Sequence, residues 1–180
     1  MSAPAPHRPG HVVLVGMMGV GKTTVGRRVA AALDRSFADS DAVIEARAGR
    51  TVREIFETDG EAAFRTLEAA GLAVAIGADE PAVIAAAGGV VLDPVNRARL
   101  KQAGTVVWLR APVDVLVHRV VSGDHRPLLA EDPEGTLRRL EDQRERLYTE
   151  VADVVVDSSQ PPDDVVAAVL GVVREREAAA

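Results

Sequence analysis

The chain has 180 residues, a length that favours one domain. Its formal net charge of -6 disfavours a protein that binds duplex nucleic acid, because such proteins usually present a basic face. It contains no cysteine, which excludes disulfides, thiolate metal sites and cysteine nucleophiles. The segment MSAPAPHRPG lacks the apolar core of a signal peptide, and no apolar run reaches the length of a membrane span. We therefore expect a cytoplasmic protein with neither nucleic-acid nor membrane partners.

Short apolar runs alternate with longer helical patterns along the chain. The strands that these runs predict are Val12–Val15, Ser36–Asp39, Ala82–Ala86, Thr105–Leu109 and Val154–Asp157. The predicted helices follow Gly21, Asp41, Thr51, Gly60, Asp93, Pro112, Glu134 and Pro161. Strands and helices that alternate in this way form a parallel sheet with helices on both faces.

Proline and glycine mark the predicted boundaries. Residues 1–10 hold three of the ten prolines and are expected to form a disordered lead to a single domain over residues 11–176. Asp93-Pro94 and Ser159-Gln160-Pro161 place a polar residue before a proline, as in a capped first helical turn. The segment SGDHRPLLAEDPEG, residues 122–135, lies between two helical patterns. A loop of that length in a compact domain is usually functional or disordered.

Residues 16–23, GMMGVGKT, match the phosphate-loop pattern G-x-x-x-x-G-K-[ST] in full. The match follows an apolar strand and opens a helical run, a context that disfavours a chance glycine-rich turn. Glycines let successive N–H groups face a polyphosphate, and the helix N-terminus adds its positive end. Lys22 would reach the β- and γ-phosphates and the Thr23 hydroxyl would bind Mg²⁺. The nucleotide-binding residues predicted here are Gly16, Gly19, Val20, Gly21, Lys22, Thr23 and Thr24, although Thr24 fits an ordinary helix position better.

Two carboxylates end the second predicted strand. Ligands bind at the carboxyl ends of strands in open α/β sheets, so Asp39 and Asp41 lie where a site is expected. Alternation along an extended chain would place both on one side, with Ser40 opposite. They could serve Mg²⁺ and a substrate hydroxyl. Asp41 could equally cap the next helix, and the two roles are compatible.

Three further features have alternative interpretations. From spacing alone, Arg65 and Glu68 are best interpreted as a surface i,i+3 pair beside core phenylalanines. Gly88-Gly89 could allow a ligand close to the backbone or simply make a tight turn. Arg126 could bring charge to a phosphoryl group from a closing lid, or be a solvated arginine on a loop.

Together the motifs resemble those of shikimate kinases, P-loop kinases of the nucleoside-monophosphate-kinase-like group. The segments that carry the resemblance are GMMGVGKTTVGRRVA, DSD, IFETDGEAAFRTLE, AAGG, HRPLL and RERLY, and they occur in the same order as in the family. The resemblance implies a three-layer α/β/α P-loop kinase fold with a five-stranded parallel sheet in the order 2-3-1-4-5. It also implies a substrate-binding helical region near residues 40–70 and a lid near residues 122–133. The implied activity is transfer of the γ-phosphoryl group of ATP to the 3-hydroxyl of shikimate, with Mg²⁺, by a monomer, in aromatic amino-acid biosynthesis.

The resemblance also implies residue roles. The implied catalytic residues are Lys22, Asp41 and Arg126. Beyond the phosphate loop, the implied nucleotide contacts are Arg119, Arg126 and Gln160, and the Mg²⁺ ligands are Thr23 and Asp39. The implied shikimate contacts are Asp41, Phe56, Phe64, Arg65, Gly88, Gly89 and Arg144. These roles replace the surface-pair interpretation of Arg65.

The chain departs from the family pattern at three positions, Ala87, Arg146 and His125. Ala87 stands where the family has the first of three glycines, and Arg146 stands where a proline is common. His125, beside the lid arginine, is interpreted as a bystander. A kinase of another polyol acid such as gluconate is therefore the alternative. A nucleotide-dependent regulatory protein and a nucleic-acid-stimulated ATPase are less favoured.

Overall fold

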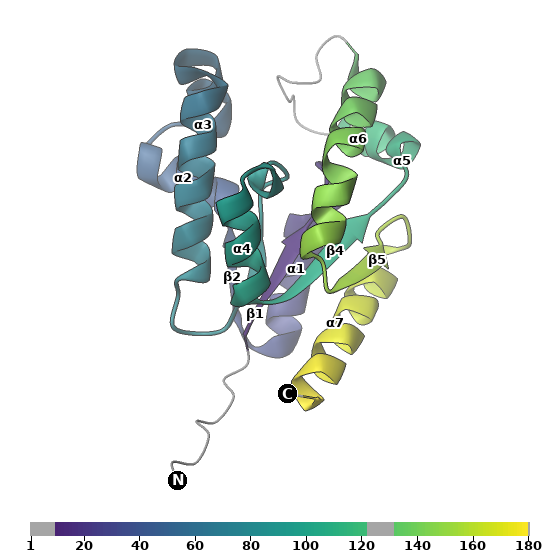
Figure 1. Cartoon of the computed structure of the whole chain (residues 1–180). Coiled ribbons are helices and arrows are strands. Elements are labelled where there is room, and N and C mark those ends of the chain that lie inside the picture. Colours follow the sequence, from purple (N-terminus) through teal and green to yellow (C-terminus); the bar gives the residue numbers. More distant parts are fainter. Residues whose placement is uncertain (1–9, 122–131, 180) are drawn as a thin grey trace.

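The computed structural model describes residues 10–121 and 132–179 (Figure 1). Its strands form one parallel sheet in the order β2-β3-β1-β4-β5, which confirms the predicted order. The strands are β1 (His11–Val15), β2 (Ser36–Asp39), β3 (Ala82–Ala85), β4 (Gly104–Arg110) and β5 (Val154–Asp157). Each predicted strand is present, with ends that differ by no more than a residue. The predicted lead and most of the predicted lid, with Arg126 and His125, lie outside the described residues.

Helices cover both faces of the sheet. They are α1 (Lys22–Leu33), α2 (Ser40–Ala48), α3 (Val52–Ile76), α4 (Pro94–Ala103), α5 (Val113–Val121), α6 (Pro133–Val151) and α7 (Pro162–Ala178), with a short 3-10 turn η1 (Val90–Leu92). In Figure 1, α4 and α6 lie in front of the sheet and α1 lies behind it. Helix α1 packs against α7, and α4 contacts both α3 and α6. The central strands β1 and β3 are buried along their whole length, as expected for strands covered on both faces.

The predicted starts of α2 and α6 and the predicted cap of α7 are wrong, and local hydrogen bonds explain each difference. Helix α6 begins at Pro133 rather than after Glu134, because the Asp132 side chain caps it by accepting from the Gly135 N–H at 2.9 Å. Helix α2 begins at Ser40 rather than after Asp41, because the Asp39 side chain caps it by accepting from the Asp41 N–H at 3.0 Å. Helix α7 begins at Pro162, directly after Pro161 as predicted, but it has no side-chain cap. The Ser159 hydroxyl, expected near that cap, donates instead to Asp157 at 2.6 Å.

Other helix ends follow the sequence signals. The Asp93 side chain caps α4 by accepting from Val95 N–H at 2.8 Å, as predicted. Thr51 opens α3 with a reciprocal capping box to Glu54. The separate helices predicted after Thr51 and Gly60 form one element that is interrupted at Gly60, where φ is 80°. Only glycine adopts this conformation readily.

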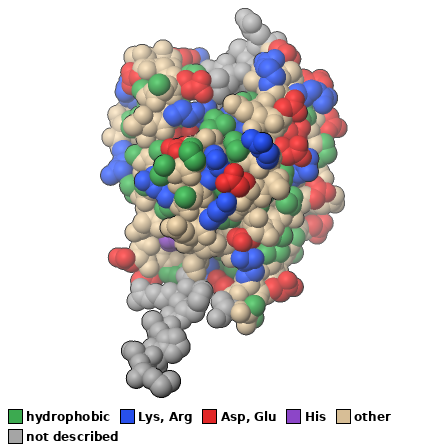
Figure 2. Space-filling view, in the orientation of Figure 1, with side chains coloured by type: hydrophobic (Ala, Val, Ile, Leu, Met, Phe, Trp, Pro, Cys, Tyr) green, Lys and Arg blue, Asp and Glu red, His purple; other side chains and the backbone are tan. Residues whose placement is uncertain are grey.

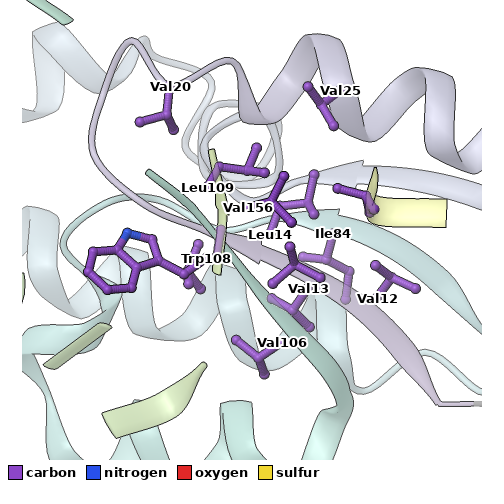
Figure 3. Packing of buried hydrophobic residues seen from close by; sticks show 14 of the residues in the cluster. Val12, Val13, Leu14, Val20, Val25, Ile84, Val106, Trp108, Leu109 and Val156 are labelled. Atoms are coloured by element: carbon purple, nitrogen blue, oxygen red, sulfur yellow. The ribbon is translucent and has the colours of Figure 1, made fainter. Parts of the chain in front are cut away.

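The core consists of a large cluster around the sheet and a small satellite. In Figure 3 the β1 side chains Val12, Val13 and Leu14 lie with Ile84 of β3 and Val106 of β4, and all are buried. The satellite, Ile44, Ile55 and Phe64, joins α2 to α3. The α2–α3 region is thus fixed by its own small apolar cluster at the edge of the sheet. Within the described part of the chain, no helix combines the length and apolarity needed to cross a membrane.

We expect Leu100→Ala to lower the free energy of unfolding by about 2–5 kcal/mol, because it leaves a cavity under α4. Leu100 is fully buried, whereas Val95 on the same helix is 55% exposed. The control Val95→Ala should therefore change stability by no more than about 0.5 kcal/mol. Urea denaturation monitored by circular dichroism measures both, and equal losses would contradict the packing described.

Candidate functional site

A cleft of about 560 Å³ opens at the carboxyl ends of β1, β2 and β3. The carboxyl edge of a parallel sheet is the usual place for a ligand. The residues that line the cleft include Gly19, Gly21, Lys22, Thr23, Thr24, Asp39, Asp41, Phe56, Phe64, Arg65, Glu68, Ala87, Gly88, Gly89, Arg119 and Arg144. One continuous space therefore joins the phosphate loop (Gly16–Thr23) to the residues of the implied acceptor pocket.

The phosphate loop has a backbone that only glycine allows. Gly16, Gly19 and Gly21 have φ values of 140°, 83° and 91°. A Cβ on Gly16 would lie 2.3 Å from the Leu109 carbonyl oxygen, so this glycine also lets the loop approach β4. Helix α1 begins directly after Gly21 with no side-chain cap. The positive end of the helix therefore faces the loop and favours an anion there.

Lys22 lies inside the loop. Its Nζ donates to the carbonyl oxygens of Gly16 and Met17 at 2.8 and 3.0 Å. The ammonium group is thereby held within the curve of the backbone where the phosphates of a nucleotide would lie. Val20, which was predicted among the contacts, is 2% exposed and packs in the core, and neither it nor Gly16 lines the cleft.

Thr23 and Asp39 form a site suited to Mg²⁺. The Thr23 hydroxyl donates to Asp39 Oδ2 at 2.7 Å, which brings α1 and the end of β2 together. Hydroxyl and carboxylate oxygens are ligands that Mg²⁺ accepts, usually with phosphates and water completing six. No cluster of three or more His, Asp or Glu ligands occurs in residues 10–121 and 132–179. The donor set thus fits an ion that takes its other ligands from a nucleotide and solvent.

Ser40 separates the two acidic residues. Asp39 and Asp41 both line the cleft, whereas Ser40 is fully buried. Asp39 and Asp41 thus lie on one side of the chain and Ser40 on the other, as predicted. Strand alternation is not the cause, because β2 ends at Asp39 and Ser40 already belongs to α2. The Ser40 Oγ accepts from the Ala87 N–H at 2.8 Å.

Arg65 is fixed by two carboxylates and a ring. It donates to Glu68 Oε2 at 2.8 Å and to Glu61 Oε1 at 3.0 Å, and it lies 5.4 Å from the centre of the Phe64 ring. Burial lowers the pKa of Arg65, but the bonds and charges of Glu68 and Glu61 outweigh it and raise the pKa overall. The Glu68 side chain is only 3% exposed, so the interpretation of a surface pair is wrong.

Gly89 allows the close approach of Arg65. A Cβ on Gly89 would lie 1.9 Å from Arg65 Nη1. Its φ of -88° is open to any residue, so close approach rather than turn geometry explains this glycine.

Arg144 reaches the same strip of backbone from α6. It is 4% exposed, and a Cβ on Gly88 would lie 3.4 Å from its Nη1. Among the described residues, no hydrogen-bond partner is found for its buried Nε. Buried polar groups are normally satisfied, so an anionic ligand would complete this site. Tyr148, one turn further along α6, donates to the Gly88 carbonyl at 2.7 Å.

Three residues of this constellation, Ser40, Glu68 and Tyr148, are not predicted by the sequence patterns. No role was predicted for Ser40 or Tyr148, and Glu68 was assigned to the surface. Spacing offered one signal, since Tyr148 follows Arg144 by four residues and so shares its helix face.

Arg119 bridges two loops beside the cleft. It donates to the Ser158 carbonyl at 2.8 Å and to the Gly19 carbonyl at 3.4 Å. Gln160 does not line the cleft and donates to Asp157 at 3.1 Å. The phosphate loop and the segment after β5 are therefore connected through Arg119.

Two of the three departures from the family pattern lie in the described residues, and their surroundings differ. Ala87 lines the cleft and is 7% exposed. Asp34 is the only non-glycine residue with positive φ in the described part of the chain, so the Ala87 methyl group causes no backbone strain. Arg146 is exposed and does not line the cleft.

We expect Thr23→Val to reduce the gain in ATP affinity that Mg²⁺ provides, on the order of tenfold, because an isosteric side chain removes one ion ligand. Thr24→Val is the control, since Thr24 lies at the cleft in the same helical turn and is exposed. Calorimetric titration of ATP with and without Mg²⁺ measures the difference. An equal effect of both variants would contradict the specific role of Thr23.

Comparison with known proteins identifies the family. The family model for shikimate kinase matches residues 18–174. A shikimate kinase from Paramagnetospirillum magneticum is 47% identical over 149 residues, which are 82% of this chain and 75% of that protein. The structure of shikimate kinase from Acinetobacter baumannii in complex with shikimate has a TM-score of 0.89 at 40% identity, covering 93% of this chain and 94% of that one. A gluconokinase from Sinorhizobium meliloti, with a TM-score of 0.68 at 24% identity over 94% of each chain, shares the fold alone. The match over most of the chain, which includes the residues on both sides of the cleft, shows that this protein belongs to the shikimate kinase family.

Proposed function

We propose that the chain transfers the γ-phosphoryl group of ATP to the 3-hydroxyl of shikimate, giving shikimate 3-phosphate and ADP in aromatic amino-acid biosynthesis. Membership of the family makes it an ATP-dependent phosphotransferase that uses Mg²⁺. The observation that carries the choice of acceptor is the cleft itself. It joins a phosphate loop at one end to two arginines and an aspartate at the other.

The nucleotide end supplies positive charge and fixed N–H groups. The loop backbone and Lys22 would hold the β- and γ-phosphates, and Arg119 would lie beside the adenine. Thr23 and Asp39 would hold Mg²⁺, which would neutralise charge that develops on the phosphates. The hydrogen bond from Thr23 to Asp39 holds the two proposed ligands side by side.

The acceptor pocket, defined as Asp41, Phe56, Phe64, Arg65, Gly88, Gly89 and Arg144, suits a cyclic hydroxy acid. A planar guanidinium matches a carboxylate in a bidentate arrangement, and Arg65 and Arg144 both face the Gly88-Gly89 backbone. The buried Nε of Arg144, for which the described residues offer no hydrogen-bond partner, is a donor that a carboxylate could satisfy. Phe56 and Phe64, with ring centres 5.7 Å apart, would form the apolar wall.

Phosphoryl transfer needs positioning and charge stabilisation more than covalent help from the protein. Asp41 would accept hydrogen bonds from the shikimate hydroxyls and orient the attacking one, as its base when the proton leaves. Arg126, outside the described residues, would bring charge to the transferring group from a lid over residues 122–133. The pairing of Arg65 with Glu68 and Glu61 would keep the acceptor arginine oriented between turnovers.

The remaining expectations are part of the same proposal. We also propose a monomer with one domain over residues 11–176, a helical acceptor-binding region near residues 40–70 and a lid. Acidic and basic side chains are interspersed on the face seen in Figure 2, which gives no support to a nucleic-acid partner. We place the enzyme in the cytoplasm, where ATP is made and used.

The acceptor is tested by coupled ADP release with Mg-ATP and, in turn, shikimate, quinate, gluconate or no acceptor. We expect turnover that depends on shikimate, because the two guanidiniums and Asp41 match its carboxylate and vicinal hydroxyls. Preference for gluconate would replace the proposed acceptor and leave the kinase chemistry intact. Turnover with no acceptor dependence would contradict the proposal.

Arg65→Ala should lower kcat/KM for shikimate by about 30- to 1,000-fold, equivalent to about 2–4 kcal/mol, because a charged bidentate contact is lost. The KM for ATP should change little, since Arg65 lies at the acceptor end. Arg146→Ala is the matched control, because this exposed arginine lies outside the cleft and its loss should leave both constants unchanged. An unaltered shikimate KM in Arg65→Ala would remove Arg65 from the pocket.

A further inference from the structure

We infer that two buried hydroxyls, those of Ser40 and Tyr148, clamp the backbone at residues 87–88 and thereby position the acceptor pocket. Neither residue has been assigned a role in the reaction above. The inference rests on the proposed function for its kinetic consequence, whereas the clamp itself can be measured without it.

The clamped segment, residues 87–88, begins just beyond the last hydrogen bond between β3 and β1. Strand β3 ends at Ala85, and one further bond, from Ala86 N–H to the Leu14 carbonyl at 3.0 Å, continues the pairing with β1. Beyond it, the Ala87 N–H and the Gly88 carbonyl have no partner strand. Both lie in residues that are largely removed from solvent, and polar backbone groups in such places need hydrogen bonds from elsewhere.

Ser40 supplies one of these bonds. It is 0% exposed, and its Oγ accepts from the Ala87 N–H at 2.8 Å. Ser40 lies between Asp39, the proposed Mg²⁺ ligand, and Asp41, the proposed hydroxyl-binding residue. The bond therefore ties the corner that carries both carboxylates to the first residue of the clamped segment.

Tyr148 supplies the other bond from the opposite side. Its Oη donates to the Gly88 carbonyl at 2.7 Å, and its ring stacks on Trp108 of β4 with 5.5 Å between ring centres. Burial raises the pKa of Tyr148 to about 12, so the phenol remains a protonated donor throughout the physiological range. Because Arg144 precedes Tyr148 by one helical turn, the same bond fixes Arg144 relative to Gly88.

The clamp matters because both acceptor arginines are fitted to this backbone. A Cβ on Gly88 would lie 3.4 Å from Arg144 Nη1, and one on Gly89 would overlap Arg65 Nη1. The position of residues 87–89 therefore determines how Arg65, Arg144 and Asp41 lie relative to one another. A small displacement of this segment would change the distance between the two guanidiniums and hence their fit to one carboxylate.

The test uses Ser40→Ala and Tyr148→Phe, which each remove one hydroxyl, in the full-length protein. Val173→Ala is the matched control, because Val173 is fully buried in α7 and its truncation destabilises the fold without touching the clamp. Hydrogen exchange of peptides that cover residues 84–92 is measured first. We expect faster exchange there in both hydroxyl variants and no selective change there in Val173→Ala. Unchanged exchange in Ser40→Ala and Tyr148→Phe would overturn the clamp, whatever the enzyme phosphorylates.

Steady-state kinetics then test the consequence for the acceptor. Each hydroxyl variant should raise the shikimate KM by about 5- to 20-fold while the ATP KM changes less than about twofold, as expected for loss of one buried hydrogen bond. The Val173→Ala variant should lose thermal stability with both KM values unchanged. Equal rises of both KM values, or stability loss alone, would overturn the positioning role. Wild-type protein without shikimate-dependent turnover would instead refute the proposed function, and the exchange result would still decide the clamp.

Discussion

The site depends on the parallel register of three strands. Leu14 of β1 pairs with Ala85 of β3, and Ala85 pairs with Asp39 of β2, so these residues lie in one row across the sheet. The residues that follow each strand leave the sheet at the same edge. The phosphate loop, the Asp39–Asp41 corner and residues 86–89 therefore meet, although up to about seventy residues separate them in the chain. None of these three segments could support phosphoryl transfer alone, because a loop that binds phosphate needs an acceptor pocket within reach of the γ-phosphate.

The proposed acceptor pocket holds two largely buried arginines in a protein whose net charge is -6. Ionised groups removed from water are stable only when they are paired or hydrogen-bonded. Arg65 satisfies this requirement with Glu68 and Glu61, which also restrict its rotation. Arg144 is more deeply buried and keeps its Nε without a partner among the described residues. One arginine is thus preorganised, whereas the other has a donor that a ligand can satisfy, and this difference favours binding of an anion at Arg144.

Much of this arrangement was predictable because its signals are local. The phosphate loop, the strand ends and the cap at Asp93 depend on neighbouring residues, and the structure has them where the sequence predicts them. The predictions were wrong where a competing local hydrogen bond, or a contact with a residue distant in the chain, determines the structure. Asp39 caps α2 in place of Asp41, and Asp157 takes the Ser159 hydroxyl. The burial of Glu68 and the bond from Tyr148 to Gly88 depend on how α3 and α6 pack against the segment after β3, which no spacing within the chain could specify.

The same reasoning explains why the chain can depart from the family pattern at Ala87 and Arg146. At position 87 the important group is the backbone N–H, which donates a hydrogen bond to the Ser40 hydroxyl. The φ angle of this residue does not require glycine. A methyl group at that position changes the wall of the cleft without altering the bond that fixes it. Arg146 projects to solvent although Arg144, two residues earlier, is buried, because residues two apart on a helix face different directions. At position 89, by contrast, Arg65 occupies the space that a Cβ would need, so any other residue there would displace the Arg65 guanidinium.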